Sequence, residues 1–152
     1  MPKDKKVFVI GMGGLEEELR NEGIQYSGGT VRIHLPLEHY NRRVRRILQD
    51  PADNTLEPFD SSSFKPDPLV GAVLCGLDTS INYTKLSKAF IYLTLNSDCL
   101  FLATNEDSTY PAAGALLPGA GAISAPIRFA LNRDPISIGK PARTMLDCIK
   151  AK

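Results

Sequence analysis

The sequence predicts an α/β fold, a mostly parallel sheet with helices on both of its faces. Four short apolar segments each end in glycine, an acid or a lysine, as buried parallel strands do. These segments are residues 6–14, 69–78, 99–110 and 135–141. Stretches of helical periodicity lie between them, and this alternation of strand and helix is typical of a parallel sheet. In such folds, sites form at the carboxyl ends of the strands.

The first elements are a strand at residues 6–10, a helix at 15–22 and a short strand at 24–26. A glycine turn at 11–14 joins the first strand to the helix. Leu15 and Leu19 lie one helical turn apart, so they define the apolar face of this helix.

The glycine turn does not have the properties of a dinucleotide-binding loop. The third glycine of that motif would fall at Glu16, and residues 16–18 are all glutamates. Three negative charges would repel a pyrophosphate at the start of the helix. We interpret these glutamates as favourable partners of the helix dipole.

Residues 30–67 are the least regular part of the sequence. They contain His34, His39 and a basic run at 41–46, followed by a loop rich in proline and serine. One short basic run in a chain of net charge +1 favours a solvated helix face over a nucleic-acid patch.

The second half of the chain alternates more clearly. A strand is predicted at 69–77 and a helix at 83–95. The next strand begins at residue 99 and breaks at Thr104 into a polar cluster that extends to residue 110, followed by a turn-rich passage at 111–122. The last predicted elements are a helix at 122–131 that contains Pro126 under some strain, a strand at 135–138 and a helix at 143–151.

Length and composition limit the classes of function that this chain could have. The chain has 152 residues, of which 43% are hydrophobic and 23% charged. This length is most simply one domain, and the near-zero net charge gives no reason to expect nucleic acid or a membrane surface as partner. The three cysteines show no metal-ligand spacing, so we expect reduced thiols and a cytoplasmic location.

Motifs for familiar chemistry are missing from the printed sequence. It contains no H-E-x-x-H, no G-x-S-x-G and no cluster of cysteines and histidines. The candidate residues are instead polar side chains at strand ends, namely Asp78, Thr104, Asn105, Asp107 and Lys140. Each has a plain structural alternative, because Asp and Asn form local turns and caps and a lysine can be a solvated charge.

Several motifs resemble those of one enzyme family. These are VLCGLD at 73–78, ATNEDSTYP at 103–111, LPGAG at 117–121 and IGKP at 138–141. Together they are similar to the 4-nitrophenylphosphatase and phosphoglycolate phosphatase branch of the haloacid dehalogenase-like phosphatases. The resemblance covers most of residues 5–150, except 30–67.

The resemblance implies a Rossmann-like cap domain. Members of this family place a nucleophilic Asp in a D-x-D-G motif before the cap, and a G-D motif that holds Mg²⁺ after it. Neither motif occurs in this sequence. We therefore expect residues 1–138 to be the cap, or substrate-specificity, domain and residues 139–152 to begin the return to a catalytic core absent from the chain.

The resemblance also assigns roles to residues. Lys140 matches the catalytic lysine that pairs with the nucleophile and the phosphoryl oxygens. Thr104, Asn105, Asp107 and Tyr110 match the loop that contacts substrate. Asp78 follows a strand as a nucleophile would, but Thr79 and Ser80 replace the second aspartate of the motif.

The expected substrate is a small phosphate monoester, such as 4-nitrophenyl phosphate or 2-phosphoglycolate. Mg²⁺ is implied for the whole enzyme and none is expected to bind these residues, so the isolated chain should be inactive. A homodimer through the cap is also implied by the resemblance. The alternatives are a dimerisation module or a stand-alone module that binds a small anion at Lys140 and a backbone nest at residues 119–122.

Overall fold

A parallel sheet of five strands forms the centre of the molecule. The computed structural model describes residues 4–30 and 58–139 of the chain. The sheet order is β2-β1-β3-β4-β7, and every neighbouring pair is parallel. The strands are β1 (Lys6–Ile10), β2 (Tyr26–Gly28), β3 (Val70–Cys75), β4 (Leu100–Ala103) and β7 (Ile136–Ser137). The predicted α/β fold with a mostly parallel sheet is thus confirmed.

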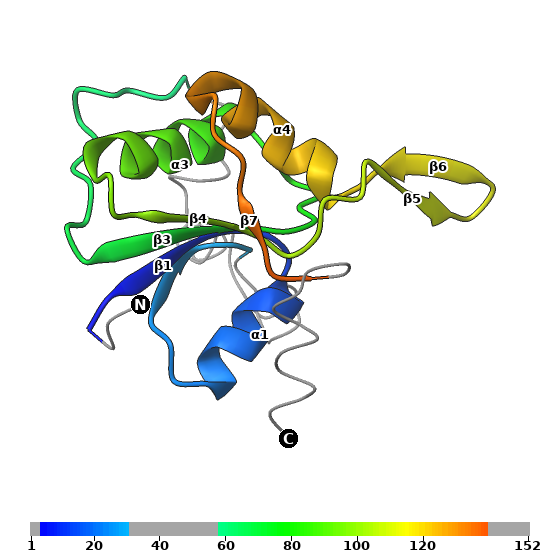
Figure 1. Cartoon of the computed structure of the whole chain (residues 1–152), viewed down its shortest axis with the longest axis horizontal. Helices are drawn as coiled ribbons and strands as arrows, with labels where there is room; N and C mark the ends of the chain where they lie inside the picture. The colour runs from blue at the N-terminus through cyan, green and yellow to red at the C-terminus, as the bar shows by residue number, and fades with distance from the viewer. Residues whose placement is uncertain (1–3, 31–57, 140–152) are drawn as a thin grey trace, which may run out of the picture.

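Helices cover both faces of this sheet, as Figure 1 shows. Helix α1 (Gly13–Asn21) lies on one face, and α3 (Tyr83–Leu95) and α4 (Ala120–Leu131) lie together on the other. Two hydrophobic clusters follow from this arrangement. Phe8 and Ile10 of β1 belong to the cluster with α3 and α4, whereas Val7 and Val9 belong to the cluster with α1.

Strand β3 is the most deeply buried element. All six of its residues are buried, because the strand lies between β1 and β4 and is covered on both faces. A continuous apolar run without polar alternation is what such a position requires. The sequence reveals this strand for that reason.

The passage after β4 is more ordered than predicted. Strand β4 ends at Ala103, as predicted from the break at Thr104. Residues 109–118 form an antiparallel hairpin of β5 (Thr109–Ala112) and β6 (Ala115–Pro118), where the sequence predicts only a turn-rich passage. The hairpin turns at Gly114, whose φ of 79° suits glycine. It projects away from the main sheet (Figure 1).

Helix α4 begins two residues earlier than predicted and contains Pro126 in its interior. The proline removes one backbone donor from the helix, and it lies on the exposed side. The helix ends at Asn132, which adopts the left-handed conformation with φ of 49°.

Some predictions fall on parts of the chain that are not described. These are the helix at 143–151, the basic run at 41–46, both histidines and Lys140. Within residues 4–30 and 58–139, no helix has the length and apolar character needed to cross a bilayer.

Candidate functional site

Backbone hydrogen bonds bring the carboxyl ends of the strands to one edge of the sheet. The N–H of Gly76 donates to the Ile10 carbonyl at 2.8 Å, and the N–H of Thr104 donates to the Cys75 carbonyl at 2.8 Å. On the far side of Thr104, the N–H of Ile138 donates to the Ala103 carbonyl at 2.9 Å. The strand ends that the sequence singled out therefore lie side by side.

Thr104 lies between two glycines at this edge. A Cβ added to Gly76 would lie 3.2 Å from Thr104 Oγ1, and one added to Gly139 would collide with the Thr104 carbonyl oxygen. The two neighbouring segments can approach Thr104 closely only because they carry no side chain there. Thr104 is half-buried, so its hydroxyl lies at the boundary between core and solvent.

Asn105 and Asp107 form a turn immediately after β4. The Asn105 side-chain oxygen accepts a hydrogen bond from the N–H of Asp107 at 3.1 Å. Glu106 and Asp107 are exposed. Asn105 thus has the turn-forming role that its residue type favours, and the turn presents two carboxylates to solvent.

The start of α4 packs against this turn. The N–H of Gly119 donates to the Ser108 carbonyl, and the N–H of Gly121 donates to the Asp107 carbonyl, both at 2.9 Å. A Cβ on Gly121 would collide with the Glu106 carbonyl oxygen. Glycine is therefore required where the helix meets the turn.

These hydrogen bonds correct the proposed anion nest at residues 119–122. The N–H of Ala122 donates to the Gly119 carbonyl at 3.0 Å, so three of the four N–H groups of the nest have protein carbonyls as partners. An anion would have to displace those carbonyls to bind, which argues against a nest here.

Tyr110 lies on the hairpin and not at the end of a sheet strand. It is half-exposed and pairs with Leu117 across the hairpin. Four of the five predicted site residues are therefore described: Thr104 and Asn105 at the sheet edge, Asp107 in the turn and Tyr110 on the hairpin. The fifth, Lys140, follows directly after the last described residue of this region.

Glu16 has a second role besides the one predicted for the three glutamates of α1. Glu16 lies in the first turn of the helix, but it is buried, with an exposed fraction of only 6%. Its carboxylate oxygen Oε1 accepts hydrogen bonds from the backbone N–H and the hydroxyl of Thr30. Glu16 therefore anchors the segment that follows β2 in addition to facing the helix dipole.

No metal centre is apparent in the described ranges. Residues 4–30 and 58–139 hold no group of three or more His, Cys, Asp or Glu side chains that could bind a metal ion. Cys75 and Cys99 are buried free thiols, as expected. Burial raises the pKa of Cys75 to about 12, with a further contribution from nearby Asp78, and burial also raises the pKa of Cys99.

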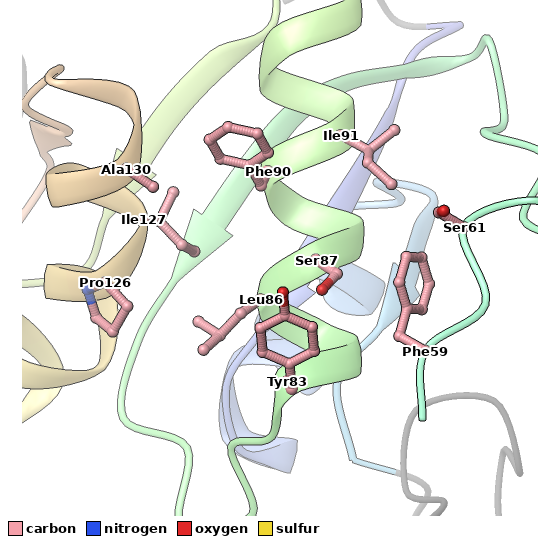
Figure 2. Close-up of a pocket in the computed structure, with 10 residues that line it drawn as sticks. All are labelled: Phe59, Ser61, Tyr83, Leu86, Ser87, Phe90, Ile91, Pro126, Ile127 and Ala130. Atoms are coloured by element: carbon pink, nitrogen blue, oxygen red, sulfur yellow. The ribbon is translucent and has the colours of Figure 1, made fainter. Parts of the chain in front are cut away.

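A pocket of about 470 Å³ lies on the outer side of α3, away from the sheet edge (Figure 2). Figure 2 shows Phe59 and Ser61 on one side of α3, and Pro126 and Ala130 of α4 on the other. The lining of the pocket is mostly aromatic and aliphatic, and its polar groups are the hydroxyls of Ser61, Ser87 and Tyr83. Apart from the aromatic Tyr83 at the start of a helix, no sequence pattern indicates this pocket.

The chain is similar in sequence to known phosphatases. No family model matches the chain. It is 42% identical over 151 residues to a 4-nitrophenylphosphatase of Schizosaccharomyces pombe, and 35% identical over 156 residues to phosphoglycolate phosphatase 2 of Arabidopsis thaliana. Each match covers 99% of this chain.

The chain is therefore similar along nearly its whole length to a 4-nitrophenylphosphatase and to a phosphoglycolate phosphatase. It spans 44% of the length of each of these two relatives.

Solved structures are similar to this chain in fold. A hypothetical protein from Pyrococcus horikoshii is 28% identical, with a TM-score of 0.64 over 97% of this chain and 44% of that one. A p-nitrophenyl phosphatase from Archaeoglobus fulgidus is 21% identical, with a TM-score of 0.61 over 95% of this chain and 40% of that one. A glycerol phosphate phosphatase from Mycobacterium tuberculosis, solved with magnesium, is 22% identical, with a TM-score of 0.65 over 99% of this chain and 35% of that one.

In this chain, Asp78 is buried inside the protein. Its Oδ2 lies 2.8 Å from Nζ of Lys85, and both side chains have an exposed fraction of 0%. Its Oδ1 accepts a hydrogen bond from the N–H of Ser80 at 2.8 Å. A phosphate group cannot reach this carboxylate without breaking the ion pair, so the resemblance of Asp78 to a nucleophile is only apparent.

Sequence reasoning missed Lys85 as the partner of Asp78. The signal was its position, because Lys85 shares the buried face of α3 with Ala89 and Tyr92, one and two turns later. A lysine on the core side of an amphipathic helix needs a buried carboxylate nearby. Asn82 caps the same helix by accepting a hydrogen bond from the N–H of Lys85 at 3.0 Å.

Proposed function

We propose that this chain forms the cap domain of a cytoplasmic phosphatase that hydrolyses small phosphate monoesters. Residues 1–138 constitute the cap, and residues 139–152 begin the segment that leads to the catalytic core. The observation that carries the proposal is the 42% identity to a 4-nitrophenylphosphatase over 99% of this chain.

Substrate selection is assigned to the turn and hairpin that follow β4. Thr104, Asn105, Asp107 and Tyr110 contact the leaving group when the cap closes over the core. Their support is the position of Thr104 and Asn105 at the carboxyl edge of the sheet, together with a hairpin that projects from that edge. Closure over the site would also exclude water from the phosphoryl group.

Lys140 is the catalytic residue that this chain supplies. A fixed ammonium group beside the phosphoryl oxygens would stabilise the negative charge that they carry. Its support is the close packing of Gly139, the preceding residue, on the carbonyl of Thr104. That packing brings the chain past the selecting residues immediately before Lys140.

The overall reaction converts a phosphate monoester and water to an alcohol and inorganic phosphate. By family resemblance, the phosphoryl group passes first to an aspartate of the core and then to water. Mg²⁺ would supply positive charge that lets a carboxylate attack a dianionic phosphate. The residues of 4–30 and 58–139 do not fit a metal site, so the ion is assigned to the core.

A homodimer through the cap is a further part of this proposal. Phe129 on α4 has an exposed fraction of 90%, which is the kind of apolar surface that a partner subunit covers. Sedimentation of the protein with and without Phe129→Asp tests it, and a monomeric unmodified protein would exclude it.

The decisive experiment compares two purified proteins in Mg²⁺ with 4-nitrophenyl phosphate as substrate. One is encoded by the complete reading frame, and the other is residues 1–152 alone. We expect turnover by the first and none by the second above a heat-inactivated control. Turnover by residues 1–152 that disappears in a folded Asp78→Asn variant would contradict the proposal and make Asp78 the nucleophile.

A reading frame that encodes only these 152 residues would favour the stand-alone module instead. Calorimetry with inorganic phosphate then separates the two forms of that alternative. Binding would indicate an anion-binding module, and a concentration-dependent mass without phosphate binding would indicate a dimerisation module.

A further inference from the structure

The pocket on the outer side of α3 holds three hydroxyl groups that have no protein partner among residues 4–30 and 58–139. These hydroxyls belong to Ser61, Tyr83 and Ser87. We propose that this pocket binds an uncharged, planar aromatic molecule that carries hydroxyl or carbonyl groups at its rim. None of the residues assigned to substrate selection lines the pocket, so the proposal does not depend on the phosphatase reaction.

The size and lining of the pocket fit a small molecule with aromatic rings. Its volume of about 470 Å³ lies within the usual range of small-molecule sites, roughly 300–1,000 Å³. Figure 2 shows that three segments form it: the chain at Phe59, the outer side of α3, and α4 at Pro126 and Ala130. The rings of Phe59, Tyr83 and Phe90 supply aromatic surface, and aromatic rings pack favourably on one another.

The absence of charge in the pocket constrains the ligand further. All ten lining residues are uncharged. Lys88 follows Ser87 on α3, but its ammonium group lies 5.5 Å from the centre of the Phe64 ring, and neither residue belongs to the lining. An ionic ligand would lose water on entering the pocket without meeting an opposite charge, whereas an uncharged ring would not carry this cost.

The Ser87 hydroxyl differs from that of Thr94 on the same helix. A serine or threonine hydroxyl within a helix commonly donates to a carbonyl of the preceding turn. Thr94 does so, because its Oγ1 lies 2.9 Å from the Phe90 carbonyl oxygen. Ser87 makes no such bond in the part of the chain that the structure describes, and its side chain lines the pocket instead.

Ser61 shows the same contrast within a run of three serines. The hydroxyls of Ser62 and Ser63 donate to Asp60, at 2.7 Å and 3.2 Å respectively. Ser61 makes no such bond to a described residue, and it lines the pocket (Figure 2). A hydroxyl can both donate and accept a hydrogen bond, so these groups can bind a hydroxyl or a carbonyl of the ligand.

The test uses the protein encoded by the complete reading frame and two probes of similar size. At neutral pH, 2-naphthol is uncharged and 2-naphthoate is an anion, and isothermal titration calorimetry measures the Kd of each. We expect 2-naphthol to bind at least about tenfold more tightly, because only the carboxylate would be buried without a counter-charge. Excess inorganic phosphate should not displace 2-naphthol, since the lining contains no cation.

Ser87→Lys places a cation in the pocket and should change its preference. The ratio of the two Kd values should shift about tenfold toward 2-naphthoate, because the ammonium group pairs with the carboxylate. Ser97→Lys is the matched control, since Ser97 is an exposed serine beyond the end of α3 and does not line the pocket. This control should leave the ratio unchanged.

Ala130→Trp should fill the pocket and weaken the binding of 2-naphthol at least about tenfold, because the indole ring takes the place of the probe. Ala125→Trp is its control, since Ala125 is also exposed on α4 but does not line the pocket. Circular dichroism checks that every variant is folded. The charge variant and the filling variant test the same site independently, so the loss of one of them to misfolding leaves the other.

Three results would overturn the proposal. The first is that 2-naphthol does not bind, or binds no more tightly than 2-naphthoate. The second is displacement by phosphate, or binding that neither Ser87→Lys nor Ala130→Trp changes, because the probe then lies elsewhere. The third is a dimer, detected by sedimentation, that excludes 2-naphthol and that Ala130→Trp dissociates, since a second copy would then occupy the pocket. No step measures ester hydrolysis, so a failure of the proposed phosphatase function would leave these results unaffected.

Discussion

Two regions at the carboxyl edge of the sheet use polar residues in opposite ways. After β3, Asp78 is fully buried and paired with Lys85, whereas after β4 the chain leaves the core as an exposed turn and hairpin. Both follow parallel strands, so strand topology alone would make both candidates for a site. The contrast teaches that a strand end becomes a site only if its side chains are accessible. The predictions below test how far the two regions differ.

Lys85→Met should cause the largest loss of stability. The substitution leaves the buried Asp78 carboxylate without its counter-charge, which typically costs about 3–5 kcal/mol. Chemical denaturation followed by circular dichroism measures this loss. Lys65→Met, at an exposed lysine, should stay within about 0.5 kcal/mol of the unmodified chain. Similar losses in the two variants would mean that the Asp78–Lys85 pair has no special role.

High pH should lower the stability of the protein through Cys75, the last residue of β3. Its pKa is about 12 in the folded chain, above the ordinary value of 9.0, so the folded state keeps a proton that the unfolded state releases. The free energy of unfolding should therefore fall as pH rises from 9 toward 12. The Cys75 contribution is about 2 kcal/mol by pH 10.5. Denaturation of Cys75→Ala should show a shallower decline, and equal slopes would exclude this source.

Alanine substitution of the glycine at the second position of a helix should change stability in opposite directions in α4 and α1. Gly121→Ala forces a Cβ against the Glu106 carbonyl and should destabilise the chain by about 1–3 kcal/mol. Gly14→Ala, at the matching position of α1, meets no atom within 4 Å and should stabilise it by up to about 1 kcal/mol. Thermal denaturation of both variants checks this. Equal effects would show that α4 does not pack closely on the turn.

The smallest effect on stability is expected on the hairpin. Leu116→Asp should change the free energy of unfolding by less than about 0.5 kcal/mol, because the leucine is 70% exposed. The same chemical denaturation that is used for Lys85→Met measures this change. A loss of several kcal/mol would show that the hairpin is part of the core, and the distinction between the two regions would fail.

The sheet could be predicted because its strands are apolar along their whole length. Strand β3 is buried at every position, and such a run has few alternatives in a chain of this size. The order of polar residues after the strands then located Thr104 and Asn105 correctly at the edge. These inferences depend only on local pattern and on parallel topology.

The hairpin could not be predicted for an equally physical reason. Its turn, Ala113-Gly114, lacks the Asn-Gly or Asp-Gly pair that marks most two-residue turns, and Pro111 and Pro118 argue against strands. The position of Lys85 on the buried face of α3 was the one sequence signal for its pairing with Asp78. The pairing itself depends on how α3 is positioned against the end of β3. Contacts between elements of this kind are set by tertiary packing rather than by local sequence.

The hydrogen bond between Gly119 and Ser108 closes the base of the hairpin. With its two ends held together, the segment 109–118 is an insert whose replacement leaves the path of the surrounding chain unchanged. If the hairpin contacts the leaving group as proposed, selection on substrate preference acts on this segment while selection on folding acts on the sheet. Proteins built in this way would acquire new substrates by exchanging one short loop.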